Sequence, residues 1–547
     1  MATTALPTGE RIDYAAILPQ RTKFMILAGV LLGLFLAALD QTIVSTALPA
    51  IIKDFNGLDL VAWTSTGYLL ASTAMVPIYG KLSDLYGRRI ILVYGIIIFL
   101  IGSALCGISQ NMIQLIAFRV IQGLGAAALT STAFAVPADL FAPAERARYM
   151  GMFAGVFGLA SVVGPFLGGL LTDTISWHWV FYVNVPLGII ALVFILRSMP
   201  SLASGIRAPI DWLGTIFLVL SVVPLLLGLT LDKNTYPWTS PTILGLLGFA
   251  AVSTAIFLYA ETKAVSPILP LSLFRMRIFS VVIAASVLNG AAFFGAILFL
   301  SLYLVNVLGV SATAAGSAQI PLMIAFVGSS IIASNTVAKI GRYKPFIMGG
   351  FAILLVGFYS MTTLTAQSTI WDVTWRMVIL GLGVGPALPL LNLALQNAMD
   401  FGQIGVATAS RQFFQQLGQA IGAAVFGVIL TTTLSAQITA NLMPIVAELP
   451  PEARSHFDPA MFRSGSISTE GGSGSQAAML ASLPPQLQQQ IAGAFKQSFA
   501  TSITTIYGYG MVLVGLAFLL VAFGLPEIPL RKTTGPGNAP PQPVIEH

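Results

Sequence analysis

Apolar stretches of about 20 residues recur along the whole chain, and each is long enough to cross a hydrocarbon core about 30 Å thick. The chain has 547 residues, of which 56% are hydrophobic and only 8% are charged. A soluble protein of this length needs far more charge to cover its surface. Because the period-two alternation of a transmembrane barrel is also absent, the sequence predicts an all-α polytopic membrane protein.

The apolar windows and their polar breaks predict fourteen transmembrane helices. We place them at 24–48, 60–80, 90–108, 113–138, 149–172, 180–197, 212–230, 242–260, 279–303, 316–337, 346–366, 372–397, 409–432 and 504–525. An even number of spans puts both termini on one side, and most of the 26 Lys and Arg residues fall on that side. The positive-inside rule therefore predicts cytoplasmic termini. This topology also accounts for the net charge of +6, so we expect no nucleic-acid partner.

Two similarities between short runs in the first and second parts of the sequence predict that the chain is built from related six-helix halves. The run 341–344 (Gly-Arg-Tyr-Lys) resembles 87–89 (Gly-Arg-Arg), and Arg376 with the glycines after it resembles Arg119 with its own. The expected segments are a cytoplasmic tail at 1–21, a first half at 22–200, two inserted helices with a cytoplasmic linker at 201–274, a second half at 275–530 and a cytoplasmic tail at 531–547.

The second half contains a long hydrophilic insertion at 433–503, which we expect to be an extracytoplasmic loop. Its middle, 464–475, is rich in Gly and Ser, as flexible linkers are. Its end, from Pro484 towards Ser498, mixes Leu, Ile and Phe with a Gln run, and this composition is typical of a helix at the membrane interface. We interpret the insertion as a tolerated loop rather than a functional lid.

Asp40 is an acidic residue within the first predicted span, whereas we place the other acidic residues in loops, tails or span ends. An ionised carboxylate in hydrocarbon costs at least about 2.5 kcal/mol. We therefore expect Asp40 to face a cavity and to bind a proton readily, because desolvation favours the neutral form. The structural alternative is an aspartate that caps a broken helix near Pro49. Arg119, in the fourth span, is either a partner for such a carboxylate or a snorkelling side chain near a helix end.

The polar run 80–89 (Gly-Lys-Leu-Ser-Asp-Leu-Tyr-Gly-Arg-Arg) separates the second and third spans. It resembles the loop signature of the major facilitator superfamily. Opposite charges at Asp84 and Arg88 can hold the second span against a neighbouring helix in one conformation and release it in another. A merely solvated loop would explain the cations but not Asp84 or the glycines. The expected gating residues here are Gly80, Asp84, Gly87, Arg88 and Arg89.

Three further runs resemble the fourteen-helix drug:proton antiporters of this superfamily. They are 39–49 in the first span, 115–125 in the fourth and 158–169 in the fifth. The resemblance implies that Asp40 is the protonatable residue of the first helix and that Arg119 takes part in proton transfer. It also implies an exporter motif with conformational roles for Gly164, Pro165, Gly168 and Gly169. Close packing of two helices would require the same glycines without any such role.

Neutral polar residues in or beside the spans are candidates for a substrate cavity. They could instead bond helices together, and we favour that interpretation for most of those in the second half. The candidates are Gln41, Trp63, Tyr68, Gln122, Asn289, Gln319 and Asn392. Asp372 and Arg376, four residues apart on one predicted helix, could form a local ion pair.

These observations predict a proton-coupled multidrug efflux transporter that exports lipophilic, cationic compounds by alternating access. The alternative is a specific metabolite uniporter or importer on the same fold. An enzyme is disfavoured because no HExxH, GxSxG, metal-spaced Cys/His cluster or phosphate loop is present. We expect no cofactor or metal, with the proton as coupling ion, and a monomer in a plasma membrane, with the bacterial inner membrane favoured.

Overall fold

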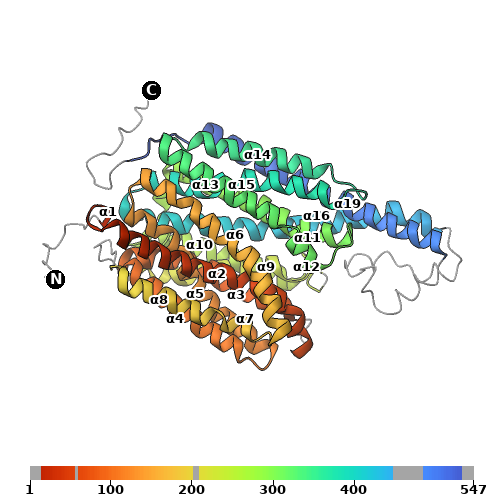
Figure 1. Ribbon diagram of the computed structural model, residues 1–547, viewed down its shortest axis with the longest axis horizontal. Coiled ribbons are helices and arrows are strands. Elements are labelled where there is room, and N and C mark those ends of the chain that lie inside the picture. Colours follow the sequence, from red (N-terminus) through yellow and green to blue (C-terminus); the bar gives the residue numbers. More distant parts are fainter. Residues whose placement is uncertain (1–13, 56–59, 201–208, 234, 448–483, 532–547) are drawn as a thin grey trace.

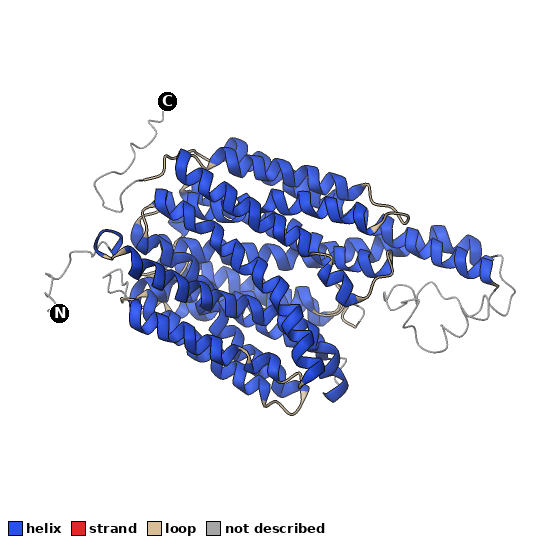
Figure 2. Ribbon diagram, in the orientation of Figure 1, coloured by secondary structure: helices blue, strands red, loops and turns tan. Residues whose placement is uncertain are grey.

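The computed structural model describes residues 14–55, 60–200, 209–233, 235–447 and 484–531. Every regular element within these residues is helical, and long helices run roughly side by side (Figure 2). Thirteen helices are long and apolar enough to cross a membrane. A fourteenth, α3 (Val61–Tyr86), is equally long but less apolar, and it packs against α5 and α16 inside the bundle. The expected polytopic helical fold is confirmed.

A short helix, α1 (Tyr14–Ile17), precedes the first six spans, which are formed by seven helices. These are α2 (Gln20–Phe55), α3, α4 (Arg88–Gly107), α5 (Met112–Leu140), α6 (Pro143–Thr174), α7 (Trp179–Tyr182) and α8 (Asn184–Ser198). Helices α7 and α8 together make one span. Helix α5 begins where the Asn111 side chain accepts a hydrogen bond from Gln114 N, which is a common helix start.

Two further spans, α9 (Trp212–Thr230) and α10 (Pro241–Lys263), pack against each other and α9 also contacts α3. The last six spans follow. Their elements are η2 (Leu271–Arg275), α11 (Arg277–Asn306), α12 (Ala312–Ser317), α13 (Ile320–Ile340), α14 (Lys344–Thr362), α15 (Ile370–Ala398), η3 (Phe401–Gln403), α16 (Ile404–Ala447), α19 (Pro485–Leu519) and a π-helical turn, η5 (Leu520–Gly524).

The two turns that resembled each other in the sequence each contain a glycine with positive φ, although their ψ angles differ, 147° at Gly87 and 8° at Gly341. Gly87, between α3 and α4, has φ 96°, and Gly341, after α13, has φ 76°. Only glycine adopts positive φ readily, so both positions require it. The buried apolar residues of the described chain form separate clusters. One large cluster lies mainly in α11–α19, and another lies in α2–α8. The exact domain boundaries stay predictions.

The two ends of the bundle are distinct (Figure 1). At one end, which we call the terminal end, α1 packs near α5 and Arg531 O accepts a hydrogen bond from Ala144 N at the start of α6. At the opposite end, which we call the hairpin end, α16 and α19 project together beyond the other helices (Figure 1). Most predicted spans match the helices within a few residues, although the eleventh ends at Thr362 rather than at 366. The helix of the second span, α3, continues to Tyr86, so Gly80 and Asp84 lie in α3 and not in the predicted loop.

The projecting hairpin corrects our expectation for 433–503. Residues 433–447 continue α16, and residues 485–503 begin α19, which is continuous with the last span rather than a separate interfacial helix. With 35 residues, α19 is about 52 Å long, longer than a bilayer is thick. Buried apolar residues hold the two helices together; they are Leu434, Ile438, Leu442, Ile491, Phe495 and Phe499. The predicted linker at 464–475 lies outside the described residues.

Candidate functional site

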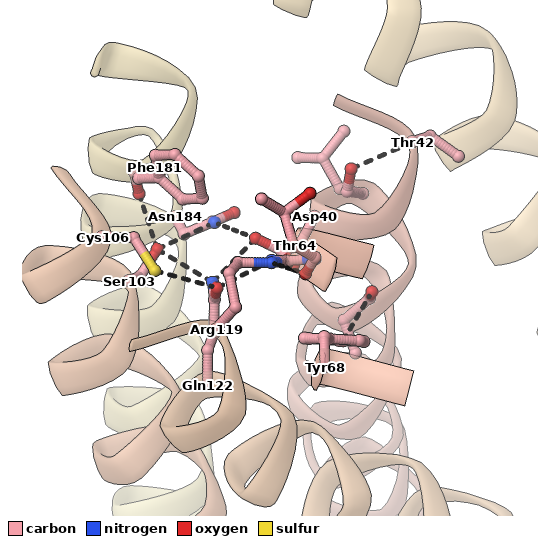
Figure 3. Close-up of polar contacts among 12 residues, drawn as sticks. Asp40, Thr42, Thr64, Tyr68, Ser103, Cys106, Arg119, Gln122, Phe181 and Asn184 are labelled. Atoms are coloured by element: carbon pink, nitrogen blue, oxygen red, sulfur yellow. Dashed lines mark hydrogen bonds and ion pairs between the residues drawn. The ribbon is translucent and has the colours of Figure 1, made fainter. Parts of the chain in front are cut away.

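Asp40 and Arg119 form an ion pair between α2 and α5 (Figure 3). The Arg119 Nη1 atom contacts Asp40 Oδ2, and the two side chains are only 2% and 0% exposed. The alternative of a snorkelling arginine is therefore wrong for this structure. The expectation that Asp40 faces a cavity is also wrong here, because its carboxylate is enclosed by protein.

Two amides complete the surroundings of the Asp40 carboxylate (Figure 3). Gln122 Nε2 donates to Asp40 Oδ1 at 2.7 Å, and Asn184 Nδ2 donates to the same oxygen at 3.2 Å. Both amides also donate to Ser103 Oγ, at 3.1 and 3.0 Å, and that hydroxyl donates to Phe181 O. The network thus joins α2, α4, α5, α7 and α8.

Arg119 is held on three sides. Its Nε donates to Thr64 O at 3.2 Å, and its Nη1 donates to Gln122 Oε1 at 2.8 Å. The Tyr68 ring lies 4.3 Å from the guanidinium carbon, in the position of a cation–π contact. The Asp40 carboxylate therefore has one cation and two amide donors around it. Movement of Arg119 away from Asp40 would break their ion pair and leave the carboxylate with the two amide donors.

The structure brings together four of the predicted site residues, namely Asp40, Arg119, Tyr68 and Gln122. Sequence reasoning missed Asn184, Ser103 and the Thr64 carbonyl. For Asn184, a polar side chain at the first residue of the apolar helix α8 was the available signal.

A second buried charge cluster lies at the terminal end. Arg88 contacts Asp84 Oδ1 through Nη2 at 2.5 Å and Asp139 Oδ2 through Nε at 2.9 Å. It also donates to Ser83 Oγ. Asp139 was missed because we placed acidic residues other than Asp40 at span ends and gave them no role. The neighbouring Arg89 is not part of the cluster and donates to Leu196 O on α8.

The charge cluster also reaches the second half of the chain. Val406 N, in the first turn of α16, donates to Asp84 Oδ2 at 2.9 Å. A Cβ atom added to Gly80 would lie 2.3 Å from the Ala409 Cβ, so α3 and α16 are in tight contact there. Arg146 on α6 donates to Gln396 Oε1 on α15 at 3.1 Å. In this conformation the two halves are therefore joined at the terminal end.

The glycines of the fifth-span motif pack α6 against α2. An added Cβ would lie 2.0 Å from Thr42 Oγ1 at Gly164 and 2.0 Å from Thr46 Oγ1 at Gly168. Thr42 also donates to Ala160 O on α6 at 2.9 Å. A Cβ added to Gly169 would meet nothing within 4 Å, so packing does not require glycine at this position. Pro165 lies within the α6 helix.

The remaining cavity candidates do not come together as one group. Gln41 is exposed and Trp63 is half-buried, whereas Asn289 and Asn392 are buried. Gln319 donates to Ser301 Oγ, a bond that joins two parts of the second half. Asn392 accepts a hydrogen bond from Arg411 Nε. The local pair of Arg376 and Asp372 is present, with its closest atoms 3.8 Å apart.

Comparisons with known proteins agree with this architecture. The Major Facilitator Superfamily profile matches residues 30–423. The chain is 37% identical to the multidrug transporter protein MdtP of Bacillus subtilis (strain 168), over 92% of this chain and 93% of that one. It is 40% identical to multidrug resistance protein 3 of the same organism, over 76% and 80%.

A likeness to a solved structure concerns the fold alone. The proton:xylose symporter XylE superposes with a TM-score of 0.59 at 14% identity, over 93% of this chain and 97% of that one. With a superfamily profile that matches most of the chain and relatives of similar length, the chain belongs to the Major Facilitator Superfamily.

Proposed function

We propose that this membrane transporter is a proton-coupled multidrug exporter that works by alternating access. Its substrates are lipophilic compounds, including the cations expected from the sequence, and a rise in drug resistance of the host is the expected consequence. The proposal is supported by multidrug-transporter relatives. The single observation that carries the coupling is the fully enclosed Asp40 carboxylate, bonded to Arg119 and two amides.

The terminal end is cytoplasmic in this proposal, because the Lys and Arg residues gather on that side. In the conformation described here the terminal ends of the two halves are joined, which corresponds to a state closed to the cytoplasm. Asp40 is ionised while it is paired with Arg119. When the halves rock, the pair separates, Asp40 takes up a proton, and the difference in proton affinity between the two states drives export.

The chain's own residues supply every charge that this scheme uses, and it requires no cofactor besides the proton. We place the protein in a plasma membrane, with a bacterial inner membrane favoured, where it acts on small molecules as a monomer. No step of the scheme makes or breaks a covalent bond in the substrate, so the proposal is for a transporter and not an enzyme.

The test uses inverted membrane vesicles, an imposed proton gradient and a fluorescent lipophilic cation. Wild type should accumulate the cation against its gradient, and dissipating the proton gradient should stop accumulation. Asp40→Asn, which stays neutral, should abolish uphill accumulation. Asp400→Asn is the matched control, because Asp400 is exposed and lies outside the Asp40 network. Gradient-independent accumulation, or an active Asp40→Asn variant, would contradict the proposal and favour a uniporter.

A further inference from the structure

Arg411 is a buried arginine of α16 that the coupling scheme does not use. Its side chain is 3% exposed and lies about two turns from the first residue of the helix. Its Nε donates to Asn392 Oδ1 at 3.2 Å, and its Nη1 donates to Gln415 Oε1 at 2.8 Å. Both acceptors are neutral amide oxygens. Neither of these two hydrogen bonds involves the third guanidinium nitrogen, Nη2.

The charge of Arg411 is not matched by a carboxylate. Among the residues that the structure describes, no ion pair involves Arg411, whereas Arg88 and Arg119 each contact an aspartate. A buried charge without an opposite charge is strongly unfavourable. Two neutral acceptors would be enough to orient an arginine that only bonds helices together, but they do not neutralise it.

Several polar atoms around Arg411 also lack a hydrogen-bond partner within the described protein. Asn392 Nδ2 and Gln412 Oε1 are two of them, and both side chains are more than nine-tenths buried. On α11, Ser286 Oγ and Asn289 Oδ1 are in the same state. Helix α11 packs against α16 from the next turn onward, because a Cβ added to Gly290 would meet Gln415 O and one added to Gly418 would meet Val287 O. A buried polar atom without a partner is unfavourable, so these atoms are available to hydrogen-bond a ligand.

Arg411 lies close to the part of α16 that closes the terminal end, so opening of that end determines whether a ligand can reach these polar atoms. Val406 and Ala409, on the preceding turns of α16, contact Asp84 and Gly80 of α3. Separation of the halves at the terminal end would therefore free the first turns of α16 and open a path to Arg411. The cluster is closed in this conformation and would be reached from the terminal side in the other.

We propose that Arg411 and Asn392 bind the carboxylate of an amphipathic anionic or zwitterionic substrate when the terminal end opens. Arg411 Nη2 and Asn392 Nδ2 are the donors for the two carboxylate oxygens, an arrangement that arginine favours. The inference rests on the proposed function and specifies a substrate class for it.

The test compares two dyes that differ only at one group. A rhodamine with a free benzoate carboxylate is a zwitterion, and its methyl ester is a cation. Fluorescence anisotropy with the purified full-length protein in detergent and lipid measures the affinity for each. Wild type should bind the acid at least about tenfold more tightly than the ester, since a charge-assisted bond is lost in the ester. In Arg411→Gln the two affinities should become about equal.

Two further variants separate recognition from packing. Arg411→Lys keeps the charge and should retain part of the preference for the acid. Ser410→Ala is the control, because Ser410 is equally buried but donates only to Val406 O of its own helix. Its acid-to-ester ratio should equal that of wild type. The ratio is internal to each variant, so partial loss of folded protein leaves it unchanged.

Two results would overturn the inference: a wild type that binds acid and ester equally, and an Arg411→Gln variant that keeps the preference, whether it retains its affinities or loses affinity for both dyes to the same extent. An equal loss of affinity for both dyes would mean that Arg411 has only a structural or gating role. Proton-driven transport of the dyes is measured separately. If wild type prefers the acid but transports neither dye, the proposed function fails while the binding site stands.

Discussion

Adding one methyl group at Gly80 should prevent α3 and α16 from closing at the terminal end. The new Cβ would lie 2.3 Å from the Ala409 Cβ, whereas non-bonded carbon atoms prefer about 3.5–4.0 Å. The helices must then separate by about 1.2 Å or more, judged against that same contact distance. A shift of this size would lengthen the 2.9 Å bond from Val406 N to Asp84 beyond hydrogen-bonding range.

Both effects act on the closed state alone. Overpacking costs about 1–3 kcal/mol, and a hydrogen bond to a charged group is worth about 1.5–3 kcal/mol. If relaxation of the helices reduces the total destabilisation of the closed state to about 2 kcal/mol, the ratio of closed to open molecules still falls about 30-fold. Gly80→Ala should therefore favour the conformation that is open at the terminal end.

Distances between spin labels measure this population. Cysteines replace Tyr86 at the end of α3 and Ile340 at the end of α13, both exposed, while the native Cys106 is buried. Gly80→Ala should move the distance distribution to longer values. The double variant Gly80→Ala with Ala409→Gly moves the methyl group from one helix to the other and should restore the wild-type distribution. An unchanged distribution in the single variant, or no restoration in the double variant, would refute the reasoning.

Two other predictions concern the first half. Gly168→Ala should destabilise the protein by about 1–3 kcal/mol through overpacking, whereas Gly169→Ala, whose Cβ meets nothing within 4 Å, should leave thermal unfolding unchanged. Equal shifts in the two variants would contradict the α2–α6 contact. Arg119→Gln alone leaves Asp40 buried without its cation and should cost about 3–5 kcal/mol of stability at neutral pH. The double variant with Asp40→Asn should recover much of this loss, and a purely additive result in thermal unfolding would show that the two side chains do not interact.

The spans were predictable because hydrophobicity and length alone specify a helix that crosses a bilayer. The predicted seventh span and α9 have the same bounds, 212–230. The hairpin of α16 and α19 was missed because its helices are amphipathic and carry many Gln, Ser and Thr residues. Its signal was a spacing of four between Leu434, Ile438 and Leu442, which is typical of a buried helix face and not of a loop.

The site was predictable only in part. Asp40 stood out because a carboxylate inside an apolar span is rare, and the resemblance indicated Arg119 as its functional companion. Their contact could not be read from the chain, because 79 residues separate them and helix packing decides which faces meet. For the same reason Asn184, 144 residues from Asp40, and Asp139, 51 residues from Arg88, were not identified as partners.

The hydrogen bonds to the Asp40 side chain come from the first half of the chain, whereas the contact that closes the terminal end joins both halves. A proton at Asp40 can therefore affect that contact directly only through a helix that takes part in both. Helix α5 meets this condition, because Arg119 is one of its residues and Asp139, which binds Arg88, lies 20 residues later, about 30 Å along the axis. Helix α6 makes no bond to Asp40 but offers an indirect route through α2, since Thr42 of α2 bonds Ala160 on α6 while Gly151 of α6 packs against Ile331 of α13. In the proposed mechanism, neutralising Asp40 removes the charge that pairs with Arg119, and α5 then moves against α2 and carries Asp139 with it. Two rigid helices thus give the buried acid a physical route to the contact between the halves.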